Sequence, residues 1–370
     1  MDKNINILLT AAGSPVFIPI CKSLKSNKNL IDRGLKIHTC DMNPEAIGLK
    51  IADSHFIVPP GNSPYFISKV LSYCKENDID LLIPAADEEL LPLSKNIDKF
   101  LDIGCKVLVS DKTVLKSIQN KSYLYNTCYN IGMGDYVPEF GVCTSSDSFK
   151  SFYSIISKNG HKVCVKPAFS HGSRGFRVFK DLPTKSDFFN KKPDPRSITY
   201  KNFLEIIEQD KESFPPLLVM EYLPGEEYSV DCLYSSGEFY CVTRRRDVIK
   251  EGICSSGTAI KKDDLIEAAK TLYTSLGINY NANIQFRYDK NNQPKILEIN
   301  PRVAGTMELC RGAGVDFVSL AVNEILGFPQ QKFTIDWGIK MTRVYQEIFH
   351  DSKILGDGCF TLESIGSVLK

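Results

Sequence analysis

The stretch Ile296-Leu297-Glu298-Ile299-Asn300-Pro301-Arg302 carries the strongest signal for the fold of this chain. It reads as a strand, and because side chains alternate along a strand, Glu298 and Asn300 present their oxygens on one face. Gln285, in the preceding strand-like run, can add a third oxygen if the two strands pair. Mg²⁺ bound to nucleotide phosphates takes hard oxygen ligands of this kind, few of them from the protein. We therefore predict that these three side chains bind Mg²⁺ or Mn²⁺.

Arg302 lies two residues beyond Asn300 and can reach the same place. Its guanidinium is suited to stabilise the negative charge that develops on a transferred phosphoryl group. A merely solvated polar face is the alternative, but a polar face in the middle of an otherwise apolar hairpin is unusual. The stretch is therefore interpreted as part of an active site.

A glycine-containing loop follows the apolar strand-like run that ends at Lys166. Backbone N–H groups of such a loop, which contains Gly172 and Gly175, can close over anionic oxygens, and the lysine adds a point charge. No Gly-Lys-Ser/Thr closes the loop, so it is not a Walker loop. Taken alone, this stretch is also compatible with a mobile hairpin that carries an exposed lysine.

A second apolar run ends at Glu221-Tyr222-Leu223 and is followed by a tight turn and another strand. Backbone groups of such a linker can surround an adenine, and the carboxylate of Glu227 can accept hydrogen bonds from ribose hydroxyls. The alternative is a hairpin with solvated acidic residues.

Two basic groups, Thr243-Arg244-Arg245-Arg246 and Arg311-Gly-Ala-Gly314, complete the candidate residues. Strand alternation puts Arg244 and Arg246 on one face and Arg245 on the other. Arg244, Arg246 and Arg311 could bind ATP phosphates or a substrate carboxylate through two-pronged contacts. A solvated basic cluster is nearly as good an interpretation for Arg245.

The first hundred residues alternate strand-like and helix-like segments, which predicts a parallel sheet with helices on both faces. The turn Thr10–Ser14 has one glycine where a dinucleotide fingerprint needs three, so we interpret it as a structural turn. After a helical segment over 110–130, strands dominate, with a hydrophilic excursion at 180–214 that carries one helix near 202–208. A helix–strand–strand block at 263–299 follows.

Taken in order, and together with Asn120-Lys121, these stretches resemble the ATP-grasp superfamily and, within it, the carbamoyl-phosphate synthase large-subunit-like branch. The resemblance covers nearly the whole chain, including Asp41-Met-Asn-Pro44 and the segment Ile79–Leu90. It implies a multi-domain α/β (α+β) chain, with an α/β pre-ATP-grasp domain over 1–112 and an ATP-grasp domain over 113–370. The latter would contain a mobile phosphate-loop subdomain at about 155–220 and a catalytic subdomain at about 221–370.

The resemblance also implies a role for each matching residue. Lys121, Lys166 and the loop glycines would bind ATP phosphates, the backbone at Glu221–Leu223 adenine, and Glu227 the ribose. Arg302 and Lys166 would be catalytic, and the oxygen side chains described first would hold the metal. The chain departs from the pattern at Asn120, where aspartate is usual, and in the long 180–214 excursion.

The implied activity is that of an Mg²⁺-dependent ligase. It would use ATP to convert a carboxylate into an acyl phosphate and join it to an amine or another nucleophile. A carbamoyl-phosphate or carboxylase-type reaction on bicarbonate, a non-catalytic ATP-binding regulator and, most remotely, a dinucleotide oxidoreductase are the alternatives. Small-molecule carboxylates and amines are the expected partners, and a homodimer stays open. The sequence names neither the carboxylate nor the nucleophile.

The composition of the chain gives no indication of a nucleic-acid, membrane or zinc partner. The formal net charge of the 370 residues is +1, so there is no global electrostatic argument for a nucleic-acid or membrane partner. No apolar run approaches the ~20 residues needed to cross a bilayer. The first strand-like run is too short for a signal peptide, and the twelve cysteines form no Cys-x-x-Cys pair. A cytoplasmic protein with reduced, structural thiols and no structural zinc is expected.

Overall fold

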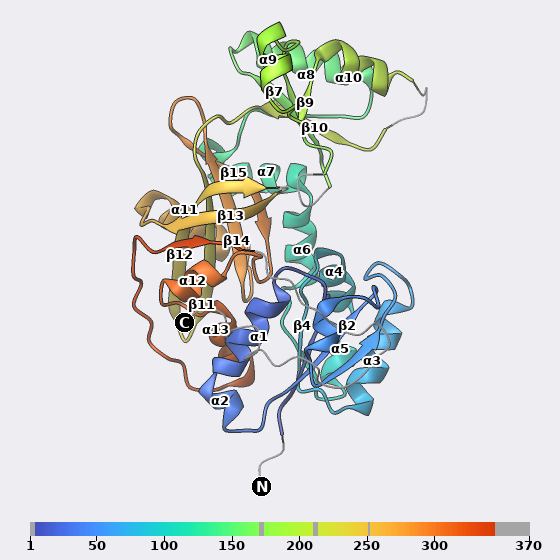
Figure 1. The fold of residues 1–370 in the computed structure, drawn as a ribbon, viewed down its shortest axis with the longest axis vertical. Coiled ribbons are helices and arrows are strands. Elements are labelled where there is room, and N and C mark those ends of the chain that lie inside the picture. Colours follow the sequence, from blue (N-terminus) through green and yellow to red (C-terminus); the bar gives the residue numbers. More distant parts are fainter. Residues whose placement is uncertain (1–3, 170–173, 210–213, 251, 345–370) are drawn as a thin grey trace.

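The computed structural model describes residues 4–169, 174–209, 214–250 and 252–344, which form three sheets (Figure 1). The first is a parallel sheet in the order β3-β2-β1-β4-β5. Its strands are β1 Asn6–Leu9, β2 Lys36–Asp41, β3 Ser54–Ile57, β4 Leu81–Ile83 and β5 Lys106–Val107. Its helices are α1 Phe17–Ser26, α2 Lys28–Ile31, α3 Phe66–Glu76, α4 Asp87–Lys95 and α5 Ile97–Leu101.

Both faces of this sheet are covered, which confirms the predicted architecture. Ile7 and Leu9 pack into one hydrophobic core with α1, whereas Leu8 packs into another with α3, α4 and α5. A parallel sheet is stable only when both of its faces are buried, and the apolar run of β1 meets that requirement. The last helix-like segment of this region forms two helices, α4 and α5, because the chain turns at Asn96.

The second sheet has the order β6-β10-β7-β8-β9. Its strands are β6 Phe140–Cys143, β7 Val163–Pro167, β8 Arg177–Phe179, β9 Ser197–Ile198 and β10 Leu217–Glu221. Its helices are α8 Ser146–Lys158, α9 Lys185–Asn190 and α10 Tyr200–Ile207. We call residues 140–221 the small subdomain; it lies at the top of Figure 1. It includes β6, which precedes the predicted range 155–220.

The small subdomain has a core of its own, built largely from aromatic rings. Phe149 lies 4.8 Å from Phe203 and 5.6 Å from Phe179, measured between ring centroids. Among the described residues, all members of this core belong to the subdomain. The predicted helix near 202–208 is present as α10, whereas α9 was not predicted.

The third sheet, here the C-terminal sheet, is antiparallel in the order β15-β14-β11-β12-β13-β16. Its strands are β11 Glu227–Ser235, β12 Glu238–Lys250, β13 Ile253–Ala259, β14 Ala282–Tyr288, β15 Pro294–Asn300 and β16 Lys340–Thr342. The associated helices are α6 Lys112–Gln119, α7 Lys121–Asn130, α11 Asp263–Ser275, α12 Glu308–Gly312 and α13 Phe317–Leu326. One face packs against α7 and α11, and the other against α12 and α13.

The N-terminal domain and the C-terminal sheet share one hydrophobic core. Phe17 and Ile20 of α1 belong to the same cluster as Leu233 of β11 and Phe317 of α13. Eleven cysteines of the described residues are buried and free, in agreement with the predicted structural thiols. Among those residues, no helix is both long and apolar enough to cross a membrane.

Candidate active site

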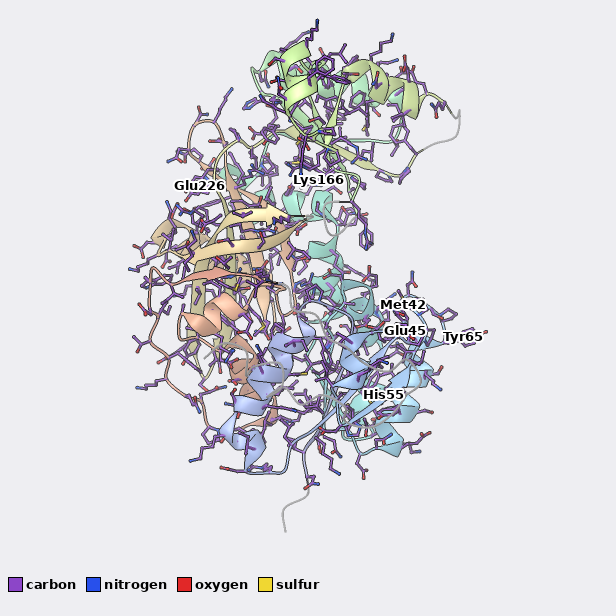
Figure 2. All side chains as sticks on the ribbon, viewed as in Figure 1. Met42, Glu45, His55, Tyr65, Lys166 and Glu226 are labelled. Carbon is purple, nitrogen blue, oxygen red and sulfur yellow. The ribbon has the colours of Figure 1, made fainter. Side chains whose placement is uncertain are left out.

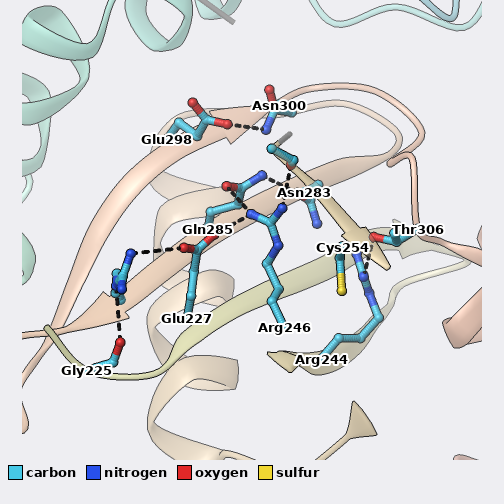
Figure 3. Close-up of polar contacts among 12 residues, drawn as sticks. Gly225, Glu227, Arg244, Arg246, Cys254, Asn283, Gln285, Glu298, Asn300 and Thr306 are labelled. Carbon is cyan, nitrogen blue, oxygen red and sulfur yellow. Dashed lines mark hydrogen bonds and ion pairs between the residues drawn. The ribbon is translucent and has the colours of Figure 1, made fainter. Parts of the chain in front are cut away.

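The predicted metal ligands lie together on β14 and β15. Gln285 pairs directly with Glu298 across the two antiparallel strands, and Asn283 pairs with Asn300. Side chains opposite one another in such a pair share a face, as Figure 3 shows for these residues. Asn300 Nδ2 donates to Glu298 Oε1 at 3.2 Å, and Gln285 Nε2 donates to Asn283 Oδ1 at 3.2 Å.

This donor set fits a magnesium ion carried by a nucleotide. It offers one carboxylate and two amide oxygens, all hard ligands, and one carboxylate alone compensates little of a divalent charge. Among the described residues, no group of three or more His, Cys, Asp or Glu side chains could hold a metal ion. Phosphate oxygens would therefore supply the remaining ligands and charge.

Lys121 and Lys166 approach the same carboxylate from different elements. Lys121, the first residue of α7, has its Nζ 3.4 Å from Glu298 Oε2. Lys166, on β7 of the small subdomain, has its Nζ 3.3 Å from the hydroxyl of Tyr125 and 3.5 Å from the carbonyl oxygen of Leu297. Figure 2 shows Lys166 where the small subdomain faces the C-terminal sheet. The two lysines predicted to bind phosphates thus converge on the predicted metal site.

Burial strongly affects the charges of these groups. It lowers the pKa of both Lys121 and Lys166, and Glu298 opposes this shift in each case. Burial would raise the pKa of Glu298, but Lys121, Asn300 and Lys166 outweigh it and hold that pKa below its usual value. Two buried ammonium groups beside one carboxylate are suited to accept further anionic oxygens.

Asn120, which stands where the family pattern usually has aspartate, caps a helix. It is the N-cap of α7, and its Oδ1 accepts from the N–H groups of Ser122 at 2.9 Å and Tyr123 at 3.4 Å. Asparagine and aspartate cap helices about equally well, so the departure from the family pattern leaves Lys121 in position.

Arg302 makes a cross-domain contact that the sequence did not reveal. Its Nε lies 2.7 Å from Asp87 Oδ1 and its Nη2 lies 2.8 Å from Asp87 Oδ2, a two-pronged ion pair. Asp87 is the first residue of α4, in the N-terminal domain. The segment around Asp87 resembles the pre-ATP-grasp domain of the family. However, no local sequence pattern links Asp87 to a residue 215 positions away.

The predicted adenine linker is held firmly by its neighbours. Glu221 donates its backbone N–H to Glu139 O at 2.9 Å, and its carboxylate lies 2.9 Å from His161 Nδ1. Tyr222 N–H donates to Lys162 O at 2.6 Å, and Leu223 is buried. Glu139 and His161 were not singled out in the sequence. They fix the strand end from which the linker leaves.

Glu227, predicted to bind ribose, is paired with arginines. Its Oε1 accepts from Arg246 Nη1, and its Oε2 lies 3.5 Å from Arg287 Nη1. Arg246 also donates to Gln285 Oε1 at 3.3 Å, so it links the predicted ribose carboxylate to a predicted metal ligand (Figure 3).

The other predicted arginines differ in their surroundings. Arg244 is almost fully buried, forms an ion pair with Asp231 and donates to Thr306 Oγ1 at 2.6 Å. It lies on the Arg246 side of β12, as alternation predicts, and therefore on the same face of the sheet as Gln285, where it is buried rather than open to solvent (Figure 3). Arg311 pairs with Glu308 on α12 at 2.8 Å, and none of its described contacts reaches the site.

The phosphate loop is described only at its ends. Gly172 lies outside the described residues. Gly175 has φ +73°, and a Cβ there would lie 2.7 Å from the ring of Pro167, so both the backbone conformation and the close approach favour glycine.

Comparison with known proteins identifies the fold family. Residues 213–347 match the family described as ATP-grasp in the biosynthetic pathway with Ter operon. This part of the chain belongs to the ATP-grasp family. Residues 7–108 match the family described as PylC-like, N-terminal domain. The resemblance to the ATP-grasp superfamily is thus confirmed.

Individual relatives of this chain are distant. The carbamoyl phosphate synthase large chain of Clostridium acetobutylicum is 27% identical over 192 residues, which are 49% of this chain and only 16% of that one. The ADP complex of N5-carboxyaminoimidazole ribonucleotide synthetase has a TM-score of 0.66 and 13% identity, over 92% of this chain and 81% of that one. The L-amino acid ligase of Bacillus licheniformis has a TM-score of 0.60 and 14% identity, over 88% and 75%. At such identities the structures support the fold alone.

Proposed function

We propose that this chain is an Mg²⁺-dependent ligase that activates a carboxylate with ATP and joins it to an amine. The observation that carries the proposal is the approach of Lys121 and Lys166 to the strand that carries Glu298 and Asn300, with Arg302 two residues beyond the end of that strand. A site that only bound nucleotide would not need an arginine placed beside the metal ligands.

The reaction would proceed in two displacements. A carboxylate oxygen of the substrate attacks the γ-phosphorus of ATP, so that an acyl phosphate forms and ADP leaves. The amine nitrogen then attacks the acyl carbon, the C–O bond to phosphate breaks, and the amine proton passes to solvent. The chain's main contribution is to position the reactants and to compensate charge.

Each group would act at a defined place. Lys121 and Lys166 would neutralise phosphate oxygens, and Glu221 to Leu223 would position the adenine through backbone groups. Glu227 would accept from the ribose hydroxyls, held in place by Arg246 and Arg287. Gln285, Glu298 and Asn300 would hold Mg²⁺, which when bound neutralises charge on the β- and γ-phosphates.

A reaction on bicarbonate is the second candidate, because a relative of 27% identity is a carbamoyl phosphate synthase large chain. We also propose a homodimer and a cytoplasmic location. The twelve cysteines, of which eleven are described as free and buried, suit a reducing compartment.

The test is ADP formation from ATP and Mg²⁺ in arrays of carboxylates and amines, each added or omitted, with bicarbonate as a separate arm. A ligase forms ADP when the right carboxylate is present, and an amide product only when the amine is added. ATP binding without ADP formation in any arm would instead support a regulator.

Removal of the metal gives a second check. Excess EDTA should abolish ADP formation, and added Mg²⁺ or Mn²⁺ should restore it, because the protein alone offers one carboxylate to the ion. The Glu298→Gln variant should need a much higher Mg²⁺ concentration for half-maximal activity than wild type. Turnover that persists in excess EDTA would contradict the metal assignment.

A further inference from the structure

A buried side-chain oxygen near the candidate active site has no hydrogen-bond partner among the described residues. It is Oδ1 of Asn281, a residue that is only 6% exposed and directly precedes β14. Because Nδ2 of the same side chain donates to the carbonyl oxygen of Phe317 at 3.0 Å, the orientation of the amide is fixed and Oδ1 is the free acceptor. Buried polar groups are nearly always hydrogen-bonded, so this oxygen requires an explanation.

Asn281 lines a small cavity. The wall of this cavity combines apolar side chains with two charged ones, and it includes Val303, Met307, Phe317, Asp231 and Arg302. A cavity of this kind, apolar with a few well-placed polar groups, is typical of a site for part of a small molecule.

The cavity lies next to the metal-ligand face, along the same sheet. Gln285 Nε2 donates to Asn283 Oδ1 at 3.2 Å (Figure 3), and Asn283 Nδ2 donates to Asp231 Oδ1 at 2.9 Å. Asp231 lines the cavity, and so does Arg302, which follows two residues after Asn300. A substrate whose carboxylate is activated beside Arg302 and the metal would therefore extend another part of itself into this cavity.

The charges of the wall restrict what the cavity can hold. Both carboxylate oxygens of Asp231 already accept from the protein, Oδ1 from Asn283 and Oδ2 from Arg244, and Arg302 is paired with Asp87. An ammonium or carboxylate group in the cavity would be buried without a charge of its own to pair with, which is strongly unfavourable. A neutral group avoids this cost. Because the free asparagine oxygen accepts, the group must donate, as a hydroxyl or a primary amide does.

We propose that this cavity recognises a neutral hydrogen-bond donor, a hydroxyl or a carboxamide, at the end of the substrate opposite to its reacting carboxylate. The donor binds Asn281 Oδ1, and the apolar stem that carries it packs against Val303, Met307 and Phe317. This inference rests on the proposed function and narrows its carboxylate to hydroxy acids and acids with a terminal amide. Asn281 is then a residue that determines which carboxylate binds.

The cavity can be tested by binding alone, without turnover. Thermal-shift titration of the full chain in the presence of MgADP compares butanoate with 4-hydroxybutanoate, pentanoate with 5-hydroxypentanoate, and 5-methylhexanoate with its amide isostere glutaramate. Wild type should bind at least one hydroxy or amide acid about tenfold or more tightly than its apolar partner, because only the donor pairs with Oδ1. The charged analogues 4-aminobutanoate and 5-aminopentanoate should bind more weakly than the hydroxy acids of the same length.

A substitution assigns the preference to Asn281. Asn281→Leu keeps a similar size but removes the acceptor, so it should lose the preference and bind the apolar acid at least as tightly as the hydroxy or amide acid. Asn190→Leu is the control: this exposed asparagine on α9 donates from Nδ2 to Ser186 Oγ at 3.4 Å, and its replacement should leave the wild-type preference unchanged.

Four results would overturn the inference. Equal binding of both members of every pair by wild type would show that Oδ1 selects nothing, and so would binding of none of them; both results hold even if Asn281→Leu fails to fold. Tightest binding of an ammonium acid would contradict a cavity for a neutral group. A preference that persists in Asn281→Leu would place the recognition elsewhere.

Failure of this inference is separable from failure of the ligase proposal, because the binding measurement does not depend on ADP formation. A donor preference without ADP formation in any arm of the carboxylate screen would refute the ligase and leave the cavity. ADP formation without a donor preference would refute the cavity alone.

Discussion

The N-terminal domain and the small subdomain are joined to the C-terminal sheet in different ways. The N-terminal domain shares a continuous hydrophobic core with that sheet, reinforced by Ser23 Oγ donating to Asp316 Oδ1 at 2.6 Å and by the Asp87–Arg302 pair. The small subdomain keeps its aromatic core to itself. It contacts the rest through a few groups, among them Ala168, Lys166 and Gly160, whose carbonyl oxygen accepts from Lys290 Nζ at 3.0 Å.

This difference separates two tasks. The predicted metal ligands and Arg302 lie on the body formed by the N-terminal domain and the C-terminal sheet, where a shared core fixes their geometry. Lys166 lies on a unit whose aromatic core is its own, although Ala168 and Leu218 of that unit pack into the core of the C-terminal sheet. We therefore expect the body to govern the rate of the chemical step and the small subdomain to govern nucleotide capture.

The largest expected effect comes from Arg302→Ala, a change in the body. It should lower the turnover rate by on the order of 10²–10³-fold while changing ATP affinity far less, because its charge is needed during phosphoryl transfer. Arg302→Lys should recover only part of the rate, since an ammonium group cannot make the two-pronged contact. Calorimetry with ATP beside ADP formation separates the two quantities. Reduced affinity with unchanged turnover would show that the body does not hold the catalytic charge.

A smaller effect, on ATP affinity rather than on the turnover rate, is expected for Lys166→Met in the small subdomain. ATP affinity should fall by on the order of 10–100-fold, because one charge-assisted phosphate contact is lost. Without nucleotide the variant should be more stable than wild type at neutral pH, since burial disfavours the charged lysine and lowers its pKa.

The pH dependence of stability tests the same lysine. Because the folded pKa lies below the ordinary value of 10.5, wild type should gain stability as pH rises through the folded pKa toward 10.5, and Lys166→Met should lack that gain. Urea unfolding between pH 7 and 10 measures it. Lys150→Met, which removes an exposed lysine on α8 paired with Glu208, is the control and should change neither affinity nor this pH dependence.

The Glu89→Gln variant should affect stability and not the chemistry, and it tests whether the body unfolds as one unit. Burial raises the pKa of Glu89 to about 7 from an ordinary 4.5, and the hydrogen bond from Thr10 only partly opposes this. The contribution of Glu89 to stability is therefore complete below pH 4.5 and lost as pH rises through about 7. Wild type should lose about 3 kcal/mol across this window relative to the variant.

Hydrogen exchange locates that change. Protection in both the N-terminal domain and the C-terminal sheet should follow the titration of Glu89, whereas protection in the small subdomain should not. Glu88→Gln, at the neighbouring and more exposed position, is the control. A response confined to the N-terminal sheet would mean that the shared core does not couple the two units.

The sequence pattern was sufficient to predict the strands that are apolar throughout and those whose side chains alternate in polarity. The apolar runs at 5–9 and 80–84 became the central strands β1 and β4. The oxygen side chains of Gln285, Glu298 and Asn300 share a face because side chains alternate along each strand and the two strands are neighbours in the sequence. The strand β13 was missed, because Ile253–Ala259 is rich in serine and glycine and has no apolar alternation.

The partners of the predicted site residues could not be foreseen. Asp87 reaches Arg302 only because α4 docks beside the end of β15, a consequence of tertiary packing with no local signal. The contact between Arg246 and Glu227 depends on the register of the β11–β12 hairpin. Sequence motifs thus predicted the groups that suit ATP chemistry, whereas their internal ion-pair partners required the folded chain.

Those internal partners limit how sequences of this kind can diverge. Lys121 with Glu298, Arg246 with Glu227 and Arg302 with Asp87 are three pairs of opposite charge, all largely buried. A single substitution strands the remaining charge at a cost of about 3–5 kcal/mol, whereas replacing both members costs far less. Homologues that have lost Arg246 should therefore also have lost the acidic group at position 227, and the same should hold for positions 87 and 302. In related chains, both residues of such an ion pair should therefore be replaced together. A chain that keeps only one residue of a pair would mark a lineage in which the other was lost recently.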